Sequence, residues 1–192
     1  GPRSPQIVSV IAARFPPPKP KPNPPELAFE PLPEPLTSSE DCLFLNVWTP
    51  LAAMGGGVAG GALPVLVYLH GGAFANGAGS DVVYHGHTLA SRGNIVVVTI
   101  NYRLGALGFL PLVPGVTPNL GIWDQIEALR WVQRHIAAFG GDPANVTVAG
   151  QSAGAMSVSA MMGSRVRREE KLFRRAIAQS GAPWAINERM AR

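Results

Sequence analysis

Cysteine is almost absent from this sequence. Cys42 is the only one among 192 residues, so no disulfide can form within the chain, and we expect its side chain to be a small buried hydrophobe. There is also no run of eighteen apolar residues, so no segment is predicted to span a membrane. No signal peptide is visible, but the chain begins at Gly1 without an initiator methionine, which leaves both secretion and a cytoplasmic location open.

Aromatic and charged residues are scarce as well, at 7% and 15% of the sequence. Basic residues fall mainly in a proline-rich start and between Arg165 and Arg175, and neither region alternates them with aromatic side chains for stacking on bases. We therefore expect no nucleic-acid partner, in spite of the formal net charge of +4. The basic run 165–175 is predicted to be the solvated face of a helix.

Residues 1–38 differ in character from the rest of the chain. Ten of the twenty positions from Pro16 to Pro35 are proline, which lacks the backbone donor and has a fixed φ. We expect an extended or disordered segment here, and a ligand for an SH3-type domain is the alternative. With 46% apolar residues, the chain is long enough for one domain with a substantial core, which we place at residues 39–192.

Short apolar runs and an amphipathic segment make up much of this domain. Val65–Leu69 and Ile95–Ile100 are rich in β-branched residues, as expected of strands buried on both faces of a parallel sheet. Between Asn119 and Phe139 apolar residues recur every three or four positions, which predicts a helix that ends at Gly140. Further strands are predicted at Leu43–Trp48 and Asn145–Ala149, a flexible hairpin or loop at Leu51–Leu63 and a second helix at Ala153–Met162. This order predicts an α/β fold.

The junction between the last strand and the last helix has the sequence Gly150-Gln151-Ser152-Ala153-Gly154. A G-x-S-x-G turn between a strand and a helix is typical of a nucleophile elbow, in which a strained serine exposes its hydroxyl. The two glycines would let the strand and the helix approach closely. The alternative is a chance match in a loop of small residues, because the pattern alone is short.

A second glycine-rich stretch, His70-Gly71-Gly72-Ala73-Phe74, follows the predicted strand Val65–Leu69. A serine nucleophile needs N–H donors aimed at the oxyanion that forms after attack, and glycine-rich backbone offers such donors without obstruction. An ordinary glycine turn is the alternative for this stretch taken alone.

In combination, five stretches resemble the N-terminal part of the type-B carboxylesterases and lipases, the family that also contains the cholinesterases. The five stretches are Ser39–Val47, His70–Phe74, Asn101–Gly105, Phe139–Gly154 and Ala178–Gly181. The resemblance implies an α/β-hydrolase fold, of which this chain would be the N-terminal portion, with a mostly parallel central sheet flanked by helices. Members of the family hydrolyse small-molecule carboxylic esters through an acyl-enzyme and need neither a metal nor an organic cofactor.

The resemblance also assigns roles to residues of the two glycine-rich stretches. It implies a nucleophile, three oxyanion donors and four supporting residues: Ser152; Gly72, Ala73 and Ala153; and Gly71, Gly150, Gln151 and Gly154. Among the supporting residues, Gly71 is expected to let the loop bend.

The chain departs from the family pattern in four respects. Gln151 stands where a glutamate is usual, which removes a negative charge and should disfavour cationic alcohols. No aromatic residue lies between Phe29 and Phe44, where cholinesterases hold choline, and no cysteine precedes Cys42 as its usual partner. Finally, no histidine follows Ser152, although in this fold the acid and the histidine come after the serine. We expect both beyond Arg192 and the isolated chain to be inactive.

Other polar residues have weaker interpretations. His85 and His87, with Asp81 nearby, could form a metal site, but a solvent-exposed loop is favoured, and we expect no metal. Arg103 and Asp142 are expected to form a buried ion pair that braces the sheet.

Two further residues stay ambiguous. Ser180 is either a hydrogen-bonding residue behind the active site, as in relatives, or a plain turn residue. Asn145 begins a glycosylation sequon that leads into a buried strand, which disfavours its use.

Two other functions compete with ester hydrolysis. The protein could be a non-catalytic carboxylesterase-like adhesion or scaffold module, but such relatives usually lose the nucleophile that this chain retains. Alternatively, the 192 residues act alone and bind a partner through unpaired sheet edges. The sequence favours the esterase, with an uncharged ester as substrate, and leaves the oligomeric state open.

Overall fold

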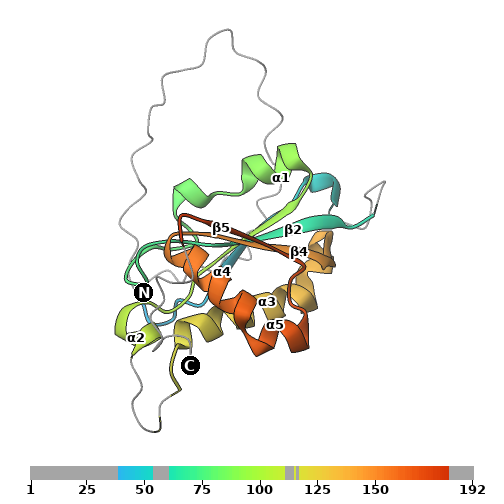
Figure 1. The fold of residues 1–192 in the computed structure, drawn as a ribbon. Helices are drawn as coiled ribbons and strands as arrows, with labels where there is room; N and C mark the ends of the chain where they lie inside the picture. The colour runs from blue at the N-terminus through green and yellow to red at the C-terminus, as the bar shows by residue number, and fades with distance from the viewer. Residues whose placement is uncertain (1–38, 54–60, 111–114, 116, 182–192) are drawn as a thin grey trace.

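The computed structural model describes residues 39–53, 61–110, 115 and 117–181, and the expected proline-rich segment 1–38 lies outside them. Five strands form one sheet in this part of the chain, in the order β1-β3-β2-β4-β5 (Figure 1). They are β1 (Leu45–Trp48), β2 (Leu63–Leu69), β3 (Val96–Ile100), β4 (Gly141–Gln151) and β5 (Arg175–Gln179). β1 is antiparallel to β3, and the other neighbours are parallel. The mostly parallel sheet is therefore confirmed.

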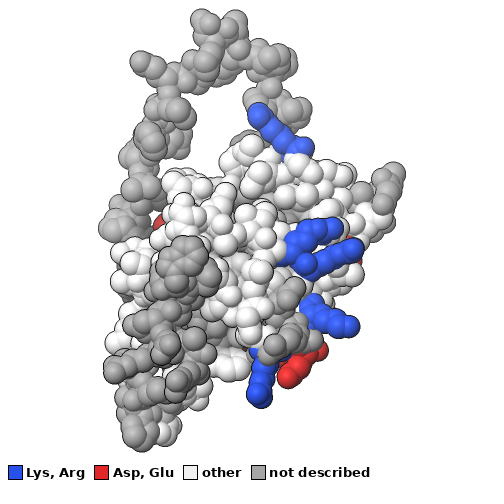
Figure 2. Space-filling view, viewed as in Figure 1, with Lys and Arg blue, Asp and Glu red and all other residues white. Residues whose placement is uncertain are grey.

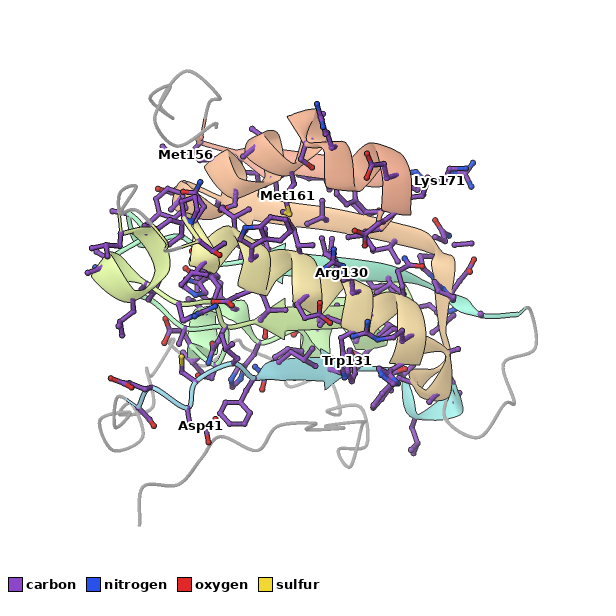
Figure 3. All side chains as sticks on the ribbon, turned by 90° about the horizontal axis from the view of Figure 1, so that it is seen from below. Asp41, Arg130, Trp131, Met156, Met161 and Lys171 are labelled. Carbon is purple, nitrogen blue, oxygen red and sulfur yellow. The ribbon has the colours of Figure 1, made fainter. Side chains whose placement is uncertain are left out.

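Helices cover both faces of the sheet. The α-helices are α1 (His87–Gly93), α2 (Gly105–Phe109), α3 (Leu120–His135), α4 (Ala153–Gly163) and α5 (Arg165–Glu170), and short 3-10 turns occupy Leu51–Ala53, Val82–Tyr84 and Ile136–Phe139. α1 lies on one face, and α3, α4 and α5 lie on the other (Figures 1 and 3). None of the helices in the described ranges is long and apolar enough to cross a membrane.

The main core lies between the central strands and the α3/α4 layer. Val65, Val67 and Leu69 of β2 are buried, and so is the apolar stripe of α3, which includes Ile126, Leu129 and Val132. Met161 of α4 is 2% exposed and extends toward α3 (Figure 3). The periodicity of α3 is confirmed, and β3 is buried on both faces as predicted. In β2 Leu66 and Tyr68 are only half-buried, so the same prediction is wrong for one face of that strand. On the other face, Ala90 of α1 packs against Trp48 of β1 and Val97 of β3 in a smaller apolar cluster.

The sheet has one more strand than the apolar runs predict, and its strand β4 is longer than predicted. β4 starts at Gly141 and not at Asn145, because Leu63 already pairs with Gly141 before a register shift. α1, α2 and β5 have no counterpart among the predicted elements. The basic run 165–175 is helical only as far as Glu170, and Arg175 is the first residue of β5. In Figure 2 the Lys and Arg side chains gather toward the right of the view, and an acidic side chain lies beside the lowest of them.

The predicted ion pair between Arg103 and Asp142 is wrong. Arg103 instead binds Asp124 of α3 through two bonds, from Nε to Oδ2 at 2.8 Å and from Nη2 to Oδ1 at 2.7 Å. The backbone N–H of Arg103 also donates to Oδ2, at 3.0 Å. Asp142 accepts from the N–H of Ala144 at 2.8 Å. The reason is topological, because Arg103 follows the end of β3 and Asp142 lies near the start of the parallel strand β4, at the opposite edge of the sheet.

Candidate active site

Three strand ends bring the two glycine-rich stretches together. β2 and β4 are parallel neighbours, with Leu69 opposite Gly150, so the loop that starts at His70 and the turn at Ser152 leave the sheet side by side. β5 ends beside them, with Gln179 opposite Gln151. The carboxyl ends of parallel strands are where open α/β sheets place their ligand sites.

Ser152 occupies a strained turn between β4 and α4. Its backbone has φ 54° and ψ −119°, a region that side-chain-bearing residues rarely adopt. The turn is held on both sides: the N–H of Ser152 donates to the carbonyl of Gln179 at 2.9 Å, and its own carbonyl accepts from Met156 at 3.0 Å. The hydroxyl makes no capping bond to α4. The strained strand-turn-helix geometry predicted for this motif is confirmed.

The glycines on either side of Ser152 are required by close packing. A Cβ on Gly150 would overlap the carbonyl carbon of Gly154, and one on Gly154 would overlap the carbonyl oxygen of Leu69. Both positions therefore need glycine so that β4, α4 and the end of β2 can approach, as the sequence predicts.

The loop after β2 touches the serine turn. A Cβ on Gly71 would come within 2.8 Å of Oε1 of Gln151 and 3.2 Å of Cβ of Ser152, so Gly71 is required for close approach. The bend expected at Gly71 occurs further on, where φ is 114° at Gly72, 54° at Ala73 and 59° at Phe74. Only the first of these three is a glycine, so the loop departs from what its residue types favour.

Hydrogen bonds from the His70 side chain and from the backbone orient the peptides of this loop. The carbonyl of Gly71 faces Nδ1 of His70 at 2.7 Å, and that of Gly72 accepts from Ala75 at 2.9 Å and Asn76 at 3.1 Å. In a trans peptide the next N–H points the opposite way from the carbonyl. The N–H groups of Gly72 and Ala73 therefore point away from these internal partners. The N–H of Ala153, at the start of α4, lies among those that a helix leaves without an internal acceptor.

His70 and Tyr102 form a buried pair beneath the loop. Their rings stack with centroids 4.4 Å apart, and the hydroxyl of Tyr102 donates to the carbonyl of His70 at 2.8 Å. Burial lowers the pKa of His70 and raises that of Tyr102, so both stay neutral near pH 7. The sequence alone assigns no role to either residue. Their positions are a usable signal, because His70 directly follows β2 and Tyr102 lies two residues after β3.

Within the described residues, the four histidine side chains contact groups other than Ser152. His70 faces the Gly71 carbonyl, His85 packs on Trp48 with centroids 5.8 Å apart, and His135 packs on Trp131 at 5.2 Å. His87 contacts the hydroxyl of Thr88 at 3.0 Å. His85 and His87 are exposed, and the described ranges hold no group of three His, Cys, Asp or Glu placed to bind a metal ion.

The remaining candidate residues lie around or away from the turn. Ser180 is exposed with φ 55°, and the contact behind Ser152 comes from the backbone of Gln179. Asn145 accepts from Nη1 of Arg175 at 2.6 Å inside β4. Cys42 was expected to be buried but is only half-buried, because it precedes β1 in a loop. This partial burial raises the pKa of its thiol.

Comparison with known proteins gives a consistent result. The sequence model of the carboxylesterase family matches residues 2–192. The chain is 47% identical over 156 residues to para-nitrobenzyl esterase of Bacillus subtilis (strain 168), a match that covers 80% of this chain and 30% of that protein. It is 48% identical over 159 residues to bile salt-activated lipase of Rattus norvegicus, covering 78% of this chain and 25% of the lipase.

Solved structures agree with the sequence matches. A PNB esterase structure superposes with a TM-score of 0.70 at 48% identity, covering 79% of this chain and 32% of that one. A thermophilic PNB esterase gives 0.70 at 47% identity, covering 78% and 30%. The chain thus has the α/β-hydrolase fold and spans about a third or less of the length of these relatives. Together with the strained serine turn, these matches show that the chain belongs to the carboxylesterase family.

Proposed function

We propose that the protein containing this chain hydrolyses uncharged carboxylic esters, with Ser152 as the nucleophile of an acyl-enzyme mechanism. The observation that carries the proposal is the backbone of Ser152, held at φ 54° and ψ −119° directly beside the glycine-rich loop. Strain of this kind is kept where a function requires it. The names of the relatives, para-nitrobenzyl esterase and bile salt-activated lipase, are in line with ester hydrolysis.

Gly72, Ala73 and Ala153 are proposed to donate their N–H groups to the oxyanion. The geometry supports this role, because two loop N–H groups point away from the loop's internal bonds and the third lies at the start of α4. Donors fixed before the reaction stabilise the negative charge that develops on the ester oxygen. After attack by the hydroxyl oxygen of Ser152, collapse of the tetrahedral intermediate expels the alcohol and leaves the acyl-serine, which water then hydrolyses.

The base and the acid of the triad are proposed to come from outside these 192 residues. Two observations support this: the histidines of the chain have contacts elsewhere, and the matched relatives are about three to four times longer than the matched segment. Residues 39–192 would then be part of an α/β-hydrolase domain, and the 192 residues alone would lack activity.

Gln151 is proposed to favour uncharged substrates. Its side chain lies beside Gly71, next to Ser152, and carries no charge. A carboxylate at this position would attract a cationic alcohol group, and the amide does not.

Labelling with a fluorophosphonate probe tests the proposal. The complete protein should be labelled, and the Ser152→Ala variant should not. Ser91→Ala is the matched control, because Ser91 is exposed on α1, which covers the opposite face of the sheet from α4, and this variant should be labelled like the wild type. Equal labelling of Ser152→Ala would refute the assignment. A complete wild-type protein that takes no label would favour the non-catalytic scaffold.

A further inference from the structure

The loop that carries the proposed oxyanion donors needs external support. Gly72, Ala73 and Phe74 have positive φ in succession, and two of the three carry a β-carbon. Such a backbone persists only where the surrounding structure holds it in place. The support for this loop comes from the segment Tyr102–Phe109, which follows β3 and includes α2.

Tyr102 holds the first end of the loop. It is 2% exposed, and its hydroxyl donates to the carbonyl of His70 at 2.8 Å while its ring stacks on the His70 imidazole with an interplanar angle of 16°. Nδ1 of that imidazole faces a carbonyl, the Gly71 oxygen at 2.7 Å, so it acts as the donor. Tyr102 thus fixes both the backbone and the ring of His70, and the ring in turn orients the peptide between Gly71 and Gly72.

The same segment holds the other end of the loop. The N–H of Gly105 donates to the carbonyl of Phe74 at 2.7 Å. The rings of Phe74 and Phe109 pack with centroids 4.7 Å apart, and Phe109 meets the ring of Tyr102 edge-on at 6.5 Å. The loop is therefore fixed on both sides of its three positive-φ residues.

The segment itself is anchored to the sheet layer. Arg103, next to Tyr102, is bound to Asp124 of α3 by its backbone and its guanidinium group. Gly108 and Gly121 both pack against the carbonyl oxygen of Arg103, so closely that a Cβ on either would clash with it. Tyr102 thus has a fixed position from which to hold His70.

We infer that Tyr102 is a positioning residue for the oxyanion donors, acting through His70 on the Gly71–Gly72 peptide. This inference rests on the function proposed for Ser152. Removal of the hydroxyl leaves a buried carbonyl without its partner and releases the strand end from which the loop starts. The donors then lose their fixed aim, which matters most in the transition state, where the charge on the oxygen is largest.

The test is the Tyr102→Phe variant of the complete protein, assayed with p-nitrophenyl acetate. It keeps the ring and its stacking and removes only the hydroxyl. We expect kcat to fall about tenfold to a hundredfold, with KM within about twofold, because the lost interaction acts in the transition state. The inhibition constant of a trifluoromethyl ketone, which forms an oxyanion on the serine, should rise by a similar factor.

Tyr68→Phe is the matched control. Tyr68 lies on β2, half-buried, with its ring packed against Tyr84 at 5.2 Å, and its kcat and inhibition constant should match the wild type. If Ser152→Ala is inactive but Tyr102→Phe keeps its kcat and inhibition constant within twofold of the wild type, the role of Tyr102 is overturned and the proposed function stands. Full activity of Ser152→Ala would instead overturn the proposed function.

A second variant covers the case in which Tyr102→Phe does not fold. Phe109→Leu weakens the ring contact at the other end of the loop and leaves the Tyr102 hydroxyl in place. We expect kcat of Phe109→Leu to fall at constant KM, by a smaller factor than in Tyr102→Phe. Unchanged kcat in this variant would overturn the role of the segment Tyr102–Phe109.

Discussion

Gly71 and Ser152 face each other across the ends of β2 and β4, so closely that a Cβ on Gly71 would lie 3.2 Å from the Cβ of Ser152. A Cβ on Gly71 would also lie 3.0 Å from the carbonyl oxygen of Gln151, a backbone atom that cannot rotate away as a side chain can. The spacing between the loop that starts at His70 and the turn at Ser152 therefore depends on the absence of a side chain at residue 71.

Gly71→Ala should reduce kcat/KM by about tenfold to a hundredfold, because it pushes the loop away from the serine by a fraction of an ångström. Steady-state kinetics of the complete protein with p-nitrophenyl acetate measures the effect. Gly93→Ala is the control, since its Cβ would lie 3.7 Å from Cγ1 of Ile95, an ordinary contact at the end of α1. Equal kinetics in the two variants would contradict this account of the spacing.

Gly154→Ala and Gly163→Ala should change stability in opposite directions, although both lie in α4. A Cβ on Gly154 overlaps the Leu69 carbonyl, whereas nothing lies within 4 Å of one on Gly163. We expect a loss of about 2–3 kcal/mol in the free energy of unfolding for the first and a gain of about 0.5–1 kcal/mol for the second. Urea unfolding followed by circular dichroism measures both, and a Gly154→Ala variant as stable as the wild type would contradict the packing described.

Asp124→Asn should cost about 2–4 kcal/mol of unfolding free energy. The side chain of Asp124 is 5% exposed and accepts three bonds from Arg103, whose own side chain is 33% exposed, so the loss falls toward the lower end of the range for buried pairs. Glu127→Gln is the control on the same helix: the Glu127 side chain is 56% exposed, and its pairs with Arg130 and Arg134 should contribute less than about 1 kcal/mol. Similar losses in both variants would show that burial does not distinguish these pairs.

Elements with buried apolar residues could be predicted from the sequence. β3 is buried at every position and leaves a short continuous run of mostly apolar residues in the sequence, whereas α3 buries one stripe and leaves a pattern that repeats every three or four residues. The serine turn could be predicted because its strain demands glycine on both sides, at Gly150 and Gly154.

Elements at the margins of the sheet could not be predicted in this way. β5 has the exposed pattern of an edge strand in the described part of the chain, with only Ala176 partly buried, and α1 buries Ala90 alone. The partner of Arg103 is set by strand direction, which residue types do not reveal. Positive φ at Ala73 and Phe74 is imposed by hydrogen bonds from Ala75, Asn76 and Gly105 to the loop, against the preference of those residues.

His70 is a buried titratable residue beneath the loop Gly71–Phe74. It is 1% exposed, and its Nε2 has no hydrogen-bond partner among the described residues, so a second proton on the ring would be buried without compensation. Burial therefore lowers the pKa of His70 below its ordinary value of 6.5, in spite of the opposing effects of the Gly71 carbonyl and Asp81. Because the unfolded chain takes up this proton first, stability is fully present above pH 6.5 and falls as the pH drops below it.

The contribution of His70 is expected as a slope in the free energy of unfolding of up to about 1.4 kcal/mol per pH unit below its unfolded pKa. His70→Asn removes the titrating ring and should flatten the slope between about pH 6.5 and 5.5, above the range in which most carboxylates titrate. His135→Asn is the control, because His135 is exposed at the end of α3, and its slope should match the wild type. Urea unfolding at several pH values measures the slopes. An unchanged slope in His70→Asn would mean that the buried ring does not control acid stability. A change confined to this variant would identify the support of the loop Gly71–Phe74 as the part of the fold that acid weakens.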